Sequence, residues 1–170
     1  MSKILQQYRA MAAGGLVFRG LTVMRHEQEI GELVRRHGAR KLLDYGCGAG
    51  EAYEKPHNLH DRWGVDRPRR YDPAFPKFGV RPRGELFDGV ICSDVLEHVQ
   101  RESVPKLIAT LFGHANRFVF ASVCCRPAGK TFPDGTNLHV TIEPYDWWWE
   151  QFRQQSERRR GVEWVLRETP

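Results

Sequence analysis

The sequence predicts an α/β domain with a mostly parallel sheet. Short apolar segments alternate along the chain with segments of helical pattern, and helices that link strands in this way make the strands parallel. A length of 170 residues suits one domain, and a composition of 41% hydrophobic and 28% charged residues is typical of globular proteins. We find no internal repeat and therefore expect one domain over residues 1–170.

The expected elements follow the order that such a sheet requires. Spacing of apolar residues and capping signals predict four helices, over residues 2–12, 22–37, 103–114 and 144–159. Apolar runs predict five strands, over residues 41–45, 63–66, 88–93, 118–123 and, at an edge, 162–166. A short helical stretch should end near Pro56, and the prolines of residues 67–84 argue against a regular helix there.

The composition also argues against several classes of protein. No segment approaches the roughly 18 apolar residues of a membrane helix, and residues 1–10 lack the apolar core of a secretion signal. We therefore expect a cytoplasmic protein without a membrane partner. The cysteines form no CxxC pair, so we expect reduced thiols and no zinc ribbon at Cys47, Cys92, Cys124 and Cys125.

The strongest local signal is the segment 42–50, LLDYGCGAG. A strand ends here in Asp44, and three glycines follow at every second position, where they allow a sharp turn and close approach of a ligand. A dinucleotide site would require the motif GxGxxG, but residue 51, the position of its third glycine, is Glu51. Asp66 closes the next expected strand, where a carboxylate can accept hydrogen bonds from ribose hydroxyls.

These motifs, together with FDGVICSDVLEHV at residues 87–99, resemble class I S-adenosylmethionine-dependent methyltransferases over residues 40–123. The resemblance implies a Rossmann-like three-layer sandwich and S-adenosylmethionine as the methyl donor. It divides the chain into N-terminal helices (1–38), a donor-binding core (39–123) and an acceptor-side loop, helix and edge strand (124–170). The expected donor site comprises Asp44, Gly46, Cys47, Gly48, Gly50, Asp66, Arg67, Ser93 and Asp94.

The chain departs from that family in two respects. Only the proline-rich segment 67–84 separates the expected ribose carboxylate from the FDxV strand, where the family has a further helix and strand. The customary antiparallel hairpin after the fifth strand is largely missing as well. We therefore expect a trimmed sheet, in which the proline-rich segment forms part of the adenine wall.

The segment DVLEH, residues 94–98, carries the candidate groups for chemistry on the acceptor. If a helix begins at Asp94, then Asp94, Glu97 and His98 share one face. This acid-x-x-Glu-His pattern resembles the metal site of ubiquinone-biosynthesis O-methyltransferases and of small-RNA 3′-terminal 2′-O-methyltransferases, although those families usually have Glu in the first position. The resemblance implies a divalent cation such as Mg²⁺ and, in the RNA branch, a later histidine, here His139.

Glu97, His98 and His139 are therefore the expected catalytic residues, and two other roles stay open for them. Either histidine could act as a general base without a metal, because an imidazole accepts a proton near neutral pH. The same side chains could instead have a purely structural role.

Three hypotheses remain for the function of the acceptor side. The first is methylation of an oxygen on a small metabolite or nucleotide. The second is methylation of RNA or DNA, which the net charge of +5 and the basic segment 67–84 favour, with the run Trp147–Trp149 offering rings for stacking on bases. The third is a partner subunit that binds the donor without catalysis. The sequence assigns no oligomeric state.

Overall fold

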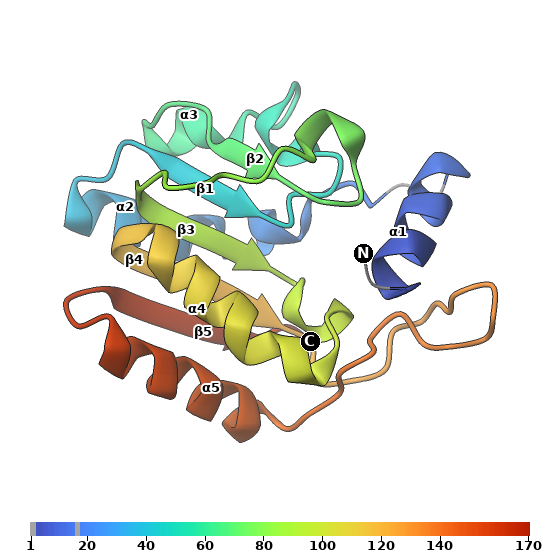
Figure 1. The fold of residues 1–170 in the computed structure, drawn as a ribbon. Coiled ribbons are helices and arrows are strands. Elements are labelled where there is room, and N and C mark those ends of the chain that lie inside the picture. Colours follow the sequence, from blue (N-terminus) through green and yellow to red (C-terminus); the bar gives the residue numbers. More distant parts are fainter. Residues whose placement is uncertain (1–2, 16–17) are drawn as a thin grey trace.

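Five parallel strands form one sheet in the order β2-β1-β3-β4-β5 (Figure 1). The structure is a computed structural model and describes residues 3–15 and 18–170. The strands are β1 Leu42–Tyr45, β2 Arg69–Tyr71, β3 Phe87–Ser93, β4 Ala115–Val123 and β5 Glu163–Glu168. The predicted α/β Rossmann-like fold is confirmed, and β5 lies at the expected edge.

Helices cover both faces of the sheet, α4 and α5 on one side and α2 on the other (Figure 1). The α-helices are α1 Lys3–Ala13, α2 Glu27–His37, α3 Leu59–Trp63, α4 Val104–His114 and α5 Tyr145–Arg158. Single 3₁₀ turns are η1 Thr22–His26, η2 Glu51–Tyr53, η3 Pro76–Phe78, η4 Leu96–His98 and η5 Arg101–Ser103. In the described ranges, every helix is too short or too polar to cross a bilayer.

The predicted helix boundaries need small corrections. The helix expected over 22–37 starts as the turn η1 and becomes α-helical only at Glu27. The helix expected over 2–12 is α1, and residue 2 lies outside the described residues. Gly38 ends α2 in the left-handed conformation, with φ of 54°, as the sequence predicts.

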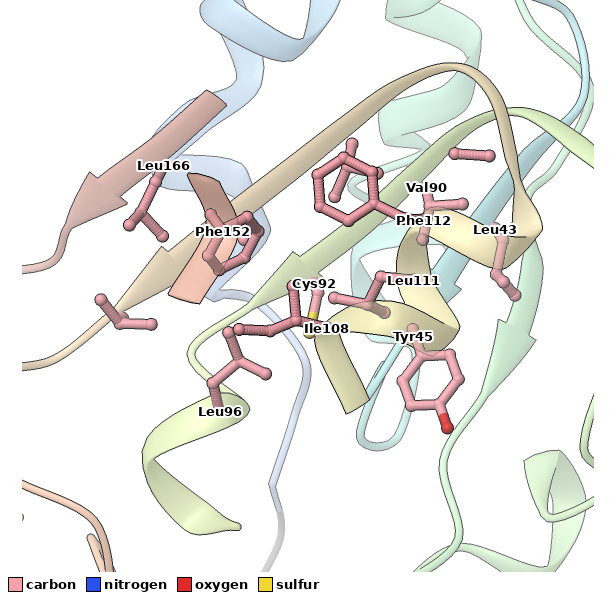
Figure 2. Close-up of a cluster of buried hydrophobic side chains, with 14 of the residues drawn as sticks. Leu43, Tyr45, Val90, Cys92, Leu96, Ile108, Leu111, Phe112, Phe152 and Leu166 are labelled. Carbon is pink, nitrogen blue, oxygen red and sulfur yellow. The ribbon is translucent and has the colours of Figure 1, made fainter. Parts of the chain in front are cut away.

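The core lies between the sheet and α4 and α5 (Figure 2). A second apolar cluster lies under α2. Strands β3 and β4 are buried on both faces, which is why their sequences are almost continuously apolar. From α5, Trp148 and Phe152 are completely buried, whereas Trp149 is 43% exposed. Successive helical positions point about 100° apart, so one face cannot bury the whole tryptophan run.

The strand predicted over residues 63–66 is wrong. Trp63 ends α3, and its ring donates a hydrogen bond to the carbonyl oxygen of Glu27 at 2.9 Å, so this segment packs against α2. The second strand of the chain is β2 instead, at the edge opposite β5, and its Arg69 pairs with Leu43 of β1. An edge strand can expose arginines, and β2 therefore has no apolar run that would mark it in the sequence. As predicted, residues 67–84 contain no α-helix.

Phe152 provides a test of this packing. Replacing its buried ring by alanine should lower the free energy of unfolding by about 3–5 kcal/mol, because a cavity remains between α5 and the sheet. Urea denaturation followed by circular dichroism measures this change. Val80, which is 71% exposed, supplies the control, and Val80→Ala should change the free energy by less than about 0.5 kcal/mol. Equal effects of the two substitutions would contradict the packing.

Candidate functional site

A cavity of about 740 Å³ lies at the carboxyl ends of β1 and β3. Gly46 and Gly48 line it from the loop after β1, and Ser93 and Asp94 line it from the end of β3. Helix α1 stands across these strand ends and adds apolar side chains such as Ile4 to the wall (Figure 1). In open parallel sheets, the crevice outside the carboxyl ends of the strands is where ligands bind.

The glycine loop, residues 46–50, is shaped by contacts within the chain. Gly46, Gly48 and Gly50 have φ values of 90°, 55° and 68°, which side chains other than glycine rarely adopt. A Cβ atom on Gly48 would lie 2.4 Å from the carbonyl oxygen of Phe18, so the segment before η1 packs directly on the loop. The amides of residues 46–51 all donate hydrogen bonds within the chain. The loop therefore meets a ligand through carbonyl oxygens and Cα atoms.

Asp44 lies beneath this loop and does not line the cavity. Burial raises the pKa of its carboxyl group to about 7. Cys47 and Gly50 are also buried without lining the cavity. Three residues of the expected donor site therefore lie outside the cavity wall.

The carboxylate at the end of the second strand is Asp72. It lines the cavity, and its two oxygens accept hydrogen bonds from the amide of Gly48 at 2.9 Å and from the amide of Ala74 at 2.8 Å. Asp66 and Arg67 are exposed and lie outside the cavity wall, because the strand expected to end at Asp66 does not form. In the sequence, Asp72 directly follows the aromatic residue Tyr71, which is a weak indication of an acid at a strand end. The two arginines of β2 gave that segment no apolar pattern, so the strand was not predicted.

Glu97, His98 and His139 come together at the cavity wall. Each offers one ligand atom, and the three atoms lie within 4.8 Å of one another. One carboxylate oxygen of Glu97, Oε1, accepts a hydrogen bond from the amide of Cys124 at 3.0 Å, whereas Oε2 is buried without a hydrogen-bond partner. Burial, and secondarily Asp94, raises the pKa of Glu97 to about 8.

Both histidines turn Nδ1 toward backbone carbonyl groups. His98 Nδ1 lies 3.0 Å from the oxygen of Leu138, and His139 Nδ1 contacts the oxygen of Arg126. Because a carbonyl oxygen can only accept, each Nδ1 carries the proton, and each Nε2 keeps a lone pair in the neutral ring. Burial lowers the pKa of His98 to about 4, so its ring is neutral at physiological pH. Two lone pairs and a carboxylate are a suitable donor set for a divalent cation.

Asp94 does not join this cluster, contrary to the predicted set of four. Its Oδ1 accepts hydrogen bonds from the hydroxyl groups of Ser122 at 2.7 Å and Thr169 at 2.6 Å. Asp94 has a φ of 53°, and the following turn, η4, begins only at Leu96. The helix that would have placed residues 94, 97 and 98 on one face is therefore absent at Asp94. Its carboxylate remains in the cavity wall beside Ser93.

The parallel sheet and the glycine loop under this cavity are typical of enzymes that bind a ligand containing a nucleoside. A model of the family described as "Methyltransferase domain" matches residues 21–168. The chain therefore belongs to this methyltransferase family, which implies S-adenosylmethionine as the methyl donor.

One relative of this chain is named as a methyltransferase. Glycine N-methyltransferase from Oryctolagus cuniculus is 27% identical over 146 residues, which cover 58% of this chain and 48% of that protein. The chain thus spans about half the length of this relative. No solved structure gives a significant match.

Gly48 and Gly64 separate the effect of loop packing from that of backbone conformation. Both have positive φ, but a Cβ on Gly64 would meet nothing within 4 Å. Gly48→Ala should therefore weaken binding of S-adenosylmethionine at least about tenfold, because the clash with Phe18 displaces the loop, whereas Gly64→Ala should carry only the backbone strain of about 1–2 kcal/mol. Calorimetric titration with the donor measures both. Equal donor affinities in the two variants would contradict the role of the loop.

Proposed function

We propose that this enzyme methylates an oxygen atom of a small acceptor molecule, assisted by a divalent cation bound by Glu97, His98 and His139. The supporting observation is the buried, unpartnered Oε2 of Glu97, a residue whose carboxylate lies beside ring nitrogens of two histidines. A buried carboxylate oxygen without a hydrogen bond is costly, and a bound cation would remove that cost. The same cavity holds the glycine loop, so a donor bound there would lie close to the cluster.

On the donor side, Asp72 is the residue that we propose for the ribose hydroxyls. Its carboxylate has lone pairs left after accepting from the amides of Gly48 and Ala74, and it faces the cavity. Pro73, Ala74 and Phe75 line the cavity directly after it and offer an apolar wall for the adenine ring. This proposal moves the ribose contact from Asp66 to Asp72.

Asp72 and Asp66 form a matched pair for calorimetry. Asp72→Ala should weaken S-adenosylmethionine binding at least about tenfold, because two charge-assisted hydrogen bonds of about 1.5 kcal/mol or more are lost. Asp66→Ala should leave the affinity within about twofold, since Asp66 lies outside the cavity wall. The opposite ranking would restore the prediction made from the sequence.

The acceptor side of the cavity must align a hydroxyl group and remove its proton. The methyl group of a sulfonium donor is already activated, so the chain contributes mainly position and a place for the proton. A bound divalent cation would lower the pKa of an acceptor hydroxyl. Glu97, His98 and His139 would hold that cation, and the Nδ1–H bonds of the histidines to Leu138 and Arg126 fix the two imidazole rings.

The role of the cation is tested by titration and by turnover. Wild-type protein should bind Mn²⁺ with a measurable heat, and Glu97→Gln should abolish that heat, because the variant loses the charged ligand. Glu102, which is exposed, supplies the control, and Glu102→Gln should bind Mn²⁺ as wild type does. Methyl transfer to hydroxyl acceptors should stop in a chelator and return with Mn²⁺.

Two other results would change the assignment. If wild type keeps full turnover in the chelator and His98→Ala loses that turnover, then His98 is a general base that acts without a metal. Transfer to amines in the chelator, with no transfer to hydroxyl groups, would favour a nitrogen acceptor, as in the name of the relative from Oryctolagus cuniculus.

The surroundings of the cavity favour a small acceptor over a nucleic acid. Arg67 and Arg70 of the basic segment pair with Glu54, and neither lines the cavity. The tryptophan run also lies outside the cavity wall, with Trp148 in the core and Trp147 beside Arg101. Apolar side chains from α1 and α4, including Ile4 and Leu107, line the cavity instead. Tight, strongly salt-dependent binding of oligonucleotides would favour the nucleic-acid alternative.

A further inference from the structure

Several contacts of helix α1 with the rest of the protein are made by exposed side chains. None of its residues is fully buried. Gln7 donates a hydrogen bond to Asp134 at 2.7 Å, Lys3 pairs with the same carboxylate at 3.3 Å, and Arg9 donates to the carbonyl oxygen of Pro73 at 2.8 Å. Exposed contacts of this kind stabilise little, so they contribute little to holding α1 over the cavity.

Tyr8 is the residue of α1 that reaches furthest into the site. Its ring lies edge-on to the rings of Phe18, Phe132 and His98, at centroid distances of 5.5, 4.9 and 5.4 Å. Its hydroxyl oxygen lies 2.6 Å from His98 Nδ1 and 2.8 Å from the carbonyl oxygen of Leu138. A residue distant in the sequence thus contacts the proposed cation ligand at its ring nitrogen Nδ1.

The three atoms in this triangle determine where the protons lie. The oxygen of Leu138 can only accept, and it takes the hydroxyl proton of Tyr8. The Tyr8 oxygen can then accept from His98 Nδ1, which makes the Nδ1–H tautomer the one that satisfies all three contacts. In the other tautomer, Nδ1 and the Leu138 oxygen would face each other at 3.0 Å with no proton between them.

We propose that Tyr8 is a positioning residue that fixes His98 with its Nε2 lone pair toward Glu97 and His139 when α1 covers the cavity. The inference rests on the proposed function of the cluster. It adds a link between coverage of the cavity by α1 and the orientation of the His98 ring. With α1 displaced, Leu138 alone would hold the ring. The reactive arrangement would then be complete only over an occupied, covered cavity, which also excludes water from the donor.

Tyr8→Phe in the full chain tests this proposal, because phenylalanine keeps the ring contacts and removes only the hydroxyl. Long-range ¹H–¹⁵N NMR of the metal-free protein should show His98 as the Nδ1–H tautomer in both proteins, because the carbonyl oxygen of Leu138 remains in the variant. The Nδ1–H proton resonance should move upfield in the variant, which lacks the short hydrogen bond to the Tyr8 oxygen. The affinity for Mn²⁺ should fall about tenfold, the lower end of the range for loss of a group that orients a metal ligand. Lys3→Ala, which removes one exposed ion pair of α1 and leaves Tyr8 and His98 in place, should bind Mn²⁺ within about twofold of wild type.

Two results would overturn the role of Tyr8. One is an Nε2–H tautomer of His98 in wild type, which needs no variant. The other is an unchanged Nδ1–H resonance of His98 together with an unchanged Mn²⁺ affinity in Tyr8→Phe. If wild type binds no Mn²⁺, the proposed cation is wrong, and the NMR comparison still decides what Tyr8 does.

Discussion

The hydrogen bond from the amide of Gly48 to the carboxylate of Asp72 ties the glycine loop to the edge of the sheet, and the rest of the site depends on it. The same loop is held at its start by the carbonyl oxygen of Tyr71, which accepts from the amides of Gly46 and Cys47. Strand β2 is only three residues long, yet it fixes the loop from one side. A short edge strand is therefore essential to the donor side of the cavity.

The second fixed point is the turn after β3. Glu97 is fully buried, its Oε1 is held by the amide of Cys124 after β4, and its carbonyl oxygen accepts from the amide of Thr141. These contacts join the ends of two neighbouring strands to the loop that carries His139. The cluster therefore depends on residues far apart in the sequence, and the parallel register of β3 and β4 brings them together.

The sequence predicted those parts of the fold that local pattern determines. Strands β3 and β4 are buried on both faces and leave apolar runs, and the glycines after Asp44 mark a turn with positive φ. It failed at β2, because an edge strand with exposed arginines carries no apolar signal. Asp72, the carboxylate that we propose for the ribose hydroxyls, was therefore missed, and Asp66 was chosen. For the cluster, the sequence identified Glu97, His98 and His139, but it could not show that a positive φ at Asp94 turns that carboxylate toward Ser122 and Thr169. The contact of Tyr8 with His98 joins residues 90 positions apart and has no local signal.

The most direct test of the account is a crystal structure of the protein with S-adenosylhomocysteine, the product of the methyl donor. The account expects both ribose hydroxyls within hydrogen-bond distance of the Asp72 carboxylate, with the adenine against Ala74 and Phe75. A ribose held by Asp66, or a ligand bound outside the cavity between the glycine loop and α1, would contradict it.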